Sequence, residues 1–304
     1  MKFNKILLVF GATLLVVIAC FSSIWITKQS HSGGKQIRNM RIAPVVFVPG
    51  SSASINRFDD LFTALNKGRR AKDKYSVLKV LVKKNNKLVY SGKVTDANHQ
   101  PFIVVGFEDN SDSYANIKRQ GKWLDIALTD LKKRYHFRQL SAVGHSNGGL
   151  DWTEYLENYY SSSDFSIDTL MTLGTPYNFS ETSITKPTDM FRDFRDGATS
   201  LPSSLTVYSI AGSEDYTTDG LVPVQSVLAG KYIFQNHVKT YTQITVSGSN
   251  AQHSDLPDNT EVIQLIQEYV LGDNNSANHR RARNALKKEV EPKKDDDQKD
   301  NKDN

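Results

Sequence analysis

Short, uninterrupted apolar runs alternate with segments of helical spacing over most of the chain. The runs that indicate buried strands are 42–48, 102–107, 140–143, 169–173, 205–211 and 241–246. Between them, apolar residues recur with helical spacing, most clearly over 113–135. Strands that are apolar on both sides are typical of a parallel sheet covered by helices on both faces. We therefore predict an α/β fold with a mostly parallel sheet and an early β-hairpin formed by 75–82 and 88–94.

This alternating region occupies residues 42–272 and predicts a single domain, because its length suits one α/β unit. A polar stretch, 27–41, contains Ser-Gly-Gly and predicts a linker. Residues 273–304 lack apolar periodicity and end in a run of charged and amide side chains, which predicts a disordered tail.

The N-terminus predicts export or membrane anchoring. Lys2 and Lys5 precede an uncharged, mainly apolar run, 6–26, which as a helix would span roughly 30 Å, the thickness of a bilayer core. Residues 1–26 are predicted to form an uncleaved signal anchor, with a cleaved signal peptide and lipidation of Cys20 as alternatives. Each outcome places the rest of the chain on the extracellular face of the cell membrane, or secretes it.

The charge pattern argues against nucleic-acid binding. The net charge is +5, but basic residues are spread along the chain and form no cluster in its central region. The sequence contains no metal-ligand cluster, phosphate-binding loop or dinucleotide fingerprint, so we expect neither a metal nor another cofactor.

The segment Gly144-His145-Ser146-Asn147-Gly148 matches the Gly-x-Ser-x-Gly pattern of a nucleophile elbow. An apolar run precedes it and a helix-compatible run follows it, as such a strand-to-helix turn requires. Glycines two residues before and after the serine are needed because the backbone there packs too closely for side chains. We therefore predict that Ser146 is a catalytic nucleophile.

A serine hydroxyl needs a base, and behind such an elbow the acid and then the histidine follow the serine along the chain. Three histidines follow Ser146. His279 lies in the polar tail, and His237 precedes the last predicted strand and therefore belongs at the opposite sheet edge. His253 follows that strand and is the predicted base.

The predicted acid lies in the loop after the strand at 205–211. Asp219 is favoured because Asp-Gly-Leu-Val-Pro resembles the acid loop of bacterial lipases, whereas Asp215 lies nearer the strand end and is the alternative. The predicted oxyanion hole consists of two backbone N–H groups, those of Ser51 and Asn147. Many proteins with such a nucleophile elbow have His-Gly where this chain has Pro49-Gly50.

The insertion at 179–204 bears on the substrate. Its Met190, Phe191 and Phe194 are spaced on one helical face, which is consistent either with a small lid over the active site or with a packing helix. Tyr177 and Phe179 suggest an apolar or aromatic pocket nearby.

Between residues 42 and 271 the chain resembles a family of uncharacterised cell-surface α/β hydrolases of Gram-positive bacteria. The resemblance rests mainly on the elbow and the acid loop, with support from Val48-Pro49-Gly50, the early hairpin, Gly174-Thr175-Pro176-Tyr177-Asn178 and His253. It implies an α/β-hydrolase fold with a Ser-Asp-His triad.

The expected function is hydrolysis of a carboxylic ester, or of an amide or thioester, through an acyl-enzyme on Ser146. The expected partners are a small-molecule or lipid-like ester and, through residues 1–26, the membrane. A catalytically silent binding domain and an acyltransferase that uses the same triad are the alternatives.

Overall fold

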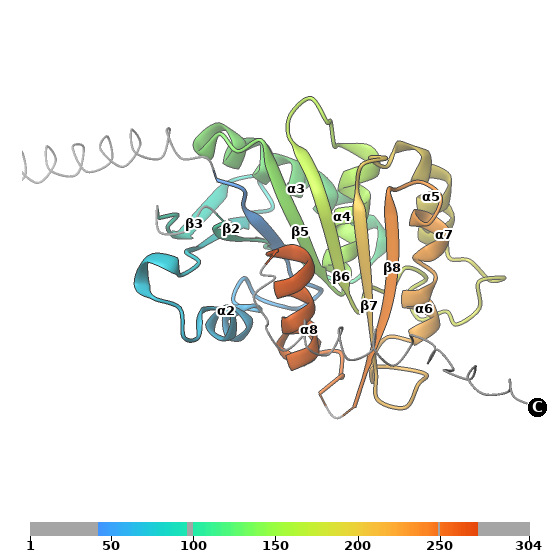
Figure 1. Cartoon of the computed structure of the whole chain (residues 1–304). Helices are drawn as coiled ribbons and strands as arrows, with labels where there is room; N and C mark the ends of the chain where they lie inside the picture. Colours follow the sequence, from blue (N-terminus) through green and yellow to red (C-terminus); the bar gives the residue numbers. More distant parts are fainter. Residues whose placement is uncertain (1–41, 96–99, 249, 273–304) are drawn as a thin grey trace, which may run out of the picture.

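The computed structural model describes residues 42–95, 100–248 and 250–272. The predicted anchor, linker and tail lie outside the described residues, which Figure 1 draws in colour. Among the described residues, no helix is both long and apolar enough to cross a membrane.

Eight strands form one sheet (Figure 1). They are β1 (Val45–Val48), β2 (Val77–Val82), β3 (Leu88–Gly92), β4 (Phe102–Phe107), β5 (Gln139–His145), β6 (Ser166–Leu173), β7 (Thr206–Ser213) and β8 (Thr240–Ser247). The spatial order is β3-β2-β4-β1-β5-β6-β7-β8. Every neighbouring pair is parallel except β2 and β3, which form the antiparallel hairpin. The predicted mostly parallel sheet and early hairpin are therefore confirmed.

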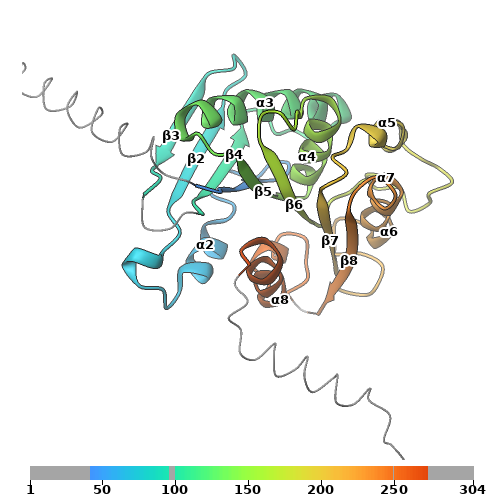
Figure 2. The same ribbon diagram turned by 45° about the horizontal axis from the view of Figure 1, so that its top comes forward.

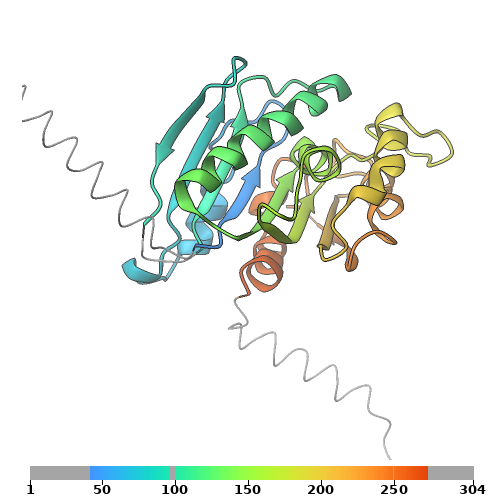
Figure 3. The ribbon, with the colours of Figure 1, turned by 90° about the horizontal axis from the view of Figure 1, so that it is seen from above.

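Helices cover both faces of the sheet, as Figures 2 and 3 show. The helices are α2 (Asp59–Asn66), α3 (Tyr114–Tyr135), α4 (Asn147–Asn158), α5 (Asp189–Gly197), α6 (Val224–Leu228), α7 (Lys231–Phe234) and α8 (Thr260–Leu265). Short 3-10 turns cover Ala71–Asp73, Ala198–Ser200 and Leu256–Asp258, and a π-helical turn, Ile266–Val270, extends α8. Buried side chains of α3, α4, α5 and α7 pack on one face, and those of α2 and α8 pack on the other.

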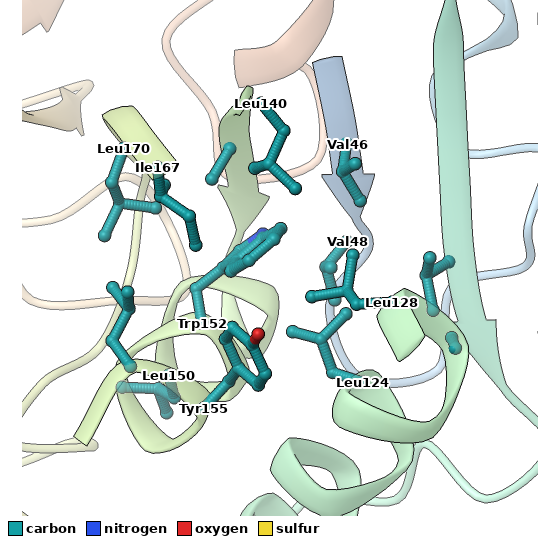
Figure 4. Packing of buried hydrophobic residues seen from close by; sticks show 14 of the residues in the cluster. Val46, Val48, Leu124, Leu128, Leu140, Leu150, Trp152, Tyr155, Ile167 and Leu170 are labelled. Atoms are coloured by element: carbon teal, nitrogen blue, oxygen red, sulfur yellow. The ribbon is translucent and has the colours of Figure 1, made fainter. Parts of the chain in front are cut away.

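The strands bury side chains on both faces because each one lies between two helical layers. Val46 and Val48 of β1 point into the core beneath α3 and α4, whereas Val45 and Phe47 point toward α2 and α8. Figure 4 shows the first of these cores, in which the fully buried Trp152 of α4 packs near Val48. Its indole N–H donates to the carbonyl of β5 residue Val143 at 3.3 Å. Truncating such a side chain costs about 3–5 kcal/mol, so this contact holds α4 firmly against β5.

The structure departs from the predicted elements at a few places. The helix predicted to follow the elbow begins at Asn147, directly after the elbow serine. The short helices α6 and α7 were not predicted, because segments of four or five residues contain too little of the helical period to reveal it.

Candidate active site

Ser146 lies at the turn between the last residue of β5 and the first residue of α4. Its φ of 55° and ψ of −128° place a non-glycine residue in a strained backbone region, as expected for a nucleophile elbow. A Cβ on Gly144 would lie only 2.6 Å from the carbonyl carbon of Gly148, so the close packing requires glycine. The tight turn projects the side chain of Ser146 at the carboxyl edge of the sheet, next to the N-terminus of α4.

His253 and Asp219 lie together at the same edge. His253 follows β8, Asp219 follows β7, and the Nδ1 of the imidazole lies 2.7 Å from Asp219 Oδ2. Both side chains are buried, and the backbone N–H of His253 also donates to the Asp219 carbonyl at 2.8 Å. The second carboxylate oxygen, Oδ1, accepts the backbone N–H groups of Leu221 and Val222 at 3.1 and 2.7 Å. These contacts orient the carboxylate toward the imidazole.

Asp215 is not brought to His253. Its side chain is exposed and accepts hydrogen bonds from the backbone N–H groups of Thr217 and Thr218 and from the Thr217 hydroxyl. These hydrogen bonds lower the pKa of Asp215. Of the two predicted acids, Asp219 is the one whose geometry allows it to orient His253, whereas Asp215 caps a surface turn.

The two predicted oxyanion donors flank the elbow. A Cβ on Gly50 would lie 2.5 Å from the Cβ of Ser146, which shows how closely the turn before Ser51 approaches the serine. Within the described part of the chain, the backbone N–H of Ser51 donates to no protein acceptor. Asn147 is the first residue of α4, and its N–H has no partner within the helix. Two free N–H groups beside one hydroxyl form a suitable site for a negatively charged oxygen.

His145, which no sequence pattern marked as functional, links the elbow to the loop of His253. Its Nε2 lies 2.9 Å from the carbonyl oxygen of His253, and the two rings are 5.0 Å apart. Burial, together with the nearby His253, holds the pKa of His145 well below its usual range. The neutral ring therefore donates from Nε2 to this carbonyl and holds the loop in place. The position of His145 directly before Ser146 was the one sequence feature that related it to the site.

A pocket of about 370 Å³ opens at Ser146. One part of its lining is polar and includes Ser51 and Asp112. The other part is largely apolar and includes Phe179 and Leu221, the latter 70% exposed. An exposed apolar side chain at the rim of a pocket that contains a serine hydroxyl is a suitable contact for the apolar part of an organic ligand. No sequence pattern pointed to Asp112, because a single aspartate in a loop has no neighbours of recognisable spacing.

The insertion contributes to this pocket through its first residues and not through its helix. Phe179 lines the pocket, but Met190, Phe191 and Phe194 of α5 are buried in the core and lie outside the pocket lining. The helix thus has the packing role, which was one of the two predicted interpretations. Tyr177 is also fully buried away from the pocket, and its hydroxyl donates to Thr172 at 3.2 Å.

Among the described residues, no group of three or more His, Cys, Asp or Glu side chains is arranged to hold a metal ion. The site geometry itself brings together a hydroxyl, an imidazole, a carboxylate and two backbone N–H donors.

Comparison with known proteins agrees with the fold. The sequence profile of a family described as "Alpha/beta hydrolase of unknown function (DUF915)" matches residues 32–273. A candidate cell surface hydrolase from Lactobacillus plantarum WCFS1, of known crystal structure, has 50% sequence identity to this chain and a TM-score of 0.72. The match covers 81% of this chain and 98% of that protein. A gene product of Listeria innocua is 30% identical with a TM-score of 0.67, covering 76% and 94%. No curated protein matches the sequence. The predicted resemblance is thereby confirmed, and the chain belongs to this family of α/β hydrolases.

Proposed function

We propose that this protein is a serine hydrolase that cleaves a carboxylic ester through an acyl-enzyme on Ser146. The observation that carries the proposal is the buried His253–Asp219 pair at the sheet edge where the strained elbow presents the Ser146 hydroxyl. A histidine that is held by a buried carboxylate is the usual activating partner of such a serine. The α/β-hydrolase fold supports a hydrolase in general, and the site geometry supports this particular chemistry.

In the acylation step, Ser146 Oγ attacks the ester carbonyl carbon while its proton passes to Nε2 of His253. The carbonyl oxygen becomes an oxyanion and accepts the backbone N–H groups of Ser51 and Asn147. Asp219 accepts the Nδ1–H and stabilises the imidazolium that forms. The tetrahedral intermediate then collapses: the bond to the leaving oxygen breaks, and His253 returns its proton to that oxygen, so that the alcohol departs neutral.

Deacylation repeats the sequence with water. His253 removes a proton from a water molecule, the resulting hydroxide attacks the acyl carbon, and the same N–H groups stabilise the second oxyanion. Collapse releases the carboxylic acid, and His253 returns the proton to Ser146. One ester and one water thus yield one acid and one alcohol, with the enzyme restored.

We further propose that this reaction takes place outside the cytoplasmic membrane, at the cell surface. The charged and apolar pattern of residues 1–26 supports this location. The relative from Lactobacillus plantarum, described as a candidate cell surface hydrolase, is 50% identical and provides independent support.

A fluorophosphonate probe tests the nucleophile directly, because it reacts with an activated serine without requiring the natural substrate. The full chain, purified in mild detergent, should be labelled at Ser146, and both Ser146→Ala and His253→Ala should lose the label. Ser180→Ala removes another serine of the same pocket and should retain it. A correctly folded wild type that resists the probe would refute the proposed function, and equal labelling of Ser146→Ala would refute the assigned nucleophile.

A further inference from the structure

The strand order places the pocket lining on two sides of Ser146. Ser146 follows β5, and the loops after β1 and β4 lie on one side of that strand. Those loops supply Ser51 and Asp112. The loops after β6 and β7 lie on the other side and supply Phe179 and Leu221 to the lining. The loop after β8, on that same side, carries the base His253. The pocket therefore has a polar side remote from the base and an apolar side that adjoins it.

Asp112 gives the polar side a negative charge. It is the one ionisable side chain in the lining of this pocket among the described residues. Its Oδ1 accepts the side-chain amide of Asn147 at 2.9 Å, a neutral partner that leaves the charge uncompensated. Within the same described residues, no lysine or arginine forms a salt bridge with it, whereas the nearby Asp109 pairs with Lys84. An exposed, oriented carboxylate in a small pocket attracts a cation.

The N-terminus of α3 stabilises this charge without cancelling it. Asp112 directly precedes Ser113, which caps α3 by accepting the N–H of Asn116. A helix N-terminus contributes about half a unit of positive charge. The full negative charge of Asp112 exceeds this, so the polar side stays net negative.

The chemistry of the proposed reaction assigns the two halves of the ester to the two sides. His253 must protonate the leaving oxygen, so the alcohol half lies toward the β7 and β8 loops, beside Leu221. The acyl half then lies on the side of Asp112. We propose, on the basis of the serine-hydrolase function above, that the substrate is an ester whose acyl group carries a positive charge, which Asp112 holds beside Ser146.

Two pairs of isosteric esters test this inference. The first pair consists of p-nitrophenyl esters whose acyl chain ends either in a trimethylammonium group or in a neutral tert-butyl group. The second pair places the same two groups on the alcohol, as butyrylcholine and its tert-butyl isostere. Within each pair the two esters have the same shape and differ only in charge, so the ratio of their kcat/KM values reports the electrostatic preference and its position.

We expect the full chain to prefer the cationic acyl group about tenfold, a size that one partly exposed charge at a few ångströms produces. The alcohol pair should show little preference. Asp112→Asn retains an oxygen for Asn147 but removes the charge, and should bring the acyl ratio close to one. The matched control is Asp168→Asn, which removes an exposed charge near the amino end of β6, at the opposite sheet edge, and should leave the ratio unchanged. Added salt should reduce the wild-type preference.

The outcomes separate this inference from the function on which it rests. If the fluorophosphonate labels Ser146 but the acyl ratio is one or below, the charged-substrate inference is wrong while the hydrolase function stands. The same holds if Asp112→Asn keeps the preference, or if the preference appears only in the alcohol pair. If the probe does not label the folded protein and no ester is cleaved, the proposed function itself fails, and this inference fails with it.

Discussion

Replacing Asp219 with asparagine should disable the base without disturbing the fold, because the structure determines which way the new amide faces. In the native site, Asp219 Oδ1 accepts two backbone N–H groups, those of Leu221 and Val222, while Oδ2 faces His253 Nδ1. An asparagine keeps both backbone hydrogen bonds only when its oxygen occupies the Oδ1 position. Its NH₂ group then points at Nδ1 of His253 and donates to it.

The magnitude follows from the cost of the opposite orientation. A reversed amide would set its NH₂ group against two N–H donors and leave both unpaired, at about 1–3 kcal/mol each. Only the reversed amide, whose oxygen faces His253 Nδ1, keeps the base productive. The difference of about 2–6 kcal/mol means that about one molecule in 30 or fewer adopts this reversed orientation. In the favoured orientation, His253 accepts at Nδ1, carries its proton on Nε2 and cannot take the proton of Ser146. We therefore expect kcat to fall at least about 30-fold and as much as about 10⁴-fold.

The assay is the initial rate of p-nitrophenyl ester hydrolysis by wild type, Asp219→Asn and Asp215→Asn. Asp215→Asn is the matched control, because its exposed side chain can still accept the N–H groups of the surface turn. Its rate should stay within about twofold of wild type. Unchanged thermal melting would show that both variants are folded. A loss below about tenfold in Asp219→Asn, or an equal loss in Asp215→Asn, would contradict the assignment of Asp219 as the acid that orients His253.

Three further predictions concern stability. Gly148→Ala should abolish fluorophosphonate labelling and lower Tm, because a Cβ there would overlap the rigid Val48 carbonyl, whereas Gly106→Ala meets only a movable Ile55 methyl and should be milder. Phe191→Ala should lower the free energy of unfolding by about 3–5 kcal/mol in a denaturant titration; a loss below about 1 kcal/mol would contradict the packing role of α5. Burial raises the pKa of Glu157 from 4.5 to about 9. The unfolded chain therefore loses this proton at a lower pH than the folded protein does, and the free energy of unfolding should fall as pH rises from about 5 to 9. Glu157→Gln should raise Tm at pH about 8 and leave it nearly unchanged at pH about 4; an equal effect at both would count against this assignment.

The sequence was sufficient for the fold class because local patterns encode it. Fully apolar runs that alternate with helical spacing require a sheet buried on both faces, and the eight-stranded, mostly parallel sheet has this form. The elbow could also be predicted from the sequence, since the backbone of the turn itself requires Gly144 and Gly148. His253 could be selected by elimination, because the order of strands along the chain determines which loops reach the sheet edge of Ser146.

Features that depend on contacts between distant segments become visible only in the folded chain. Asp219 and Asp215 lie four residues apart in one loop, and only the fold shows that Asp219 faces His253, 34 residues further along the chain. Neither the link from His145 to the His253 loop nor the charge of Asp112 in the pocket has a local pattern. The residue pattern alone predicts the sheet, the elbow and the edge at which the site lies, because backbone packing and periodicity are local. The orientation of the acid and the charge beside the serine arise where loops from separate strands meet, and only the folded chain brings those loops together.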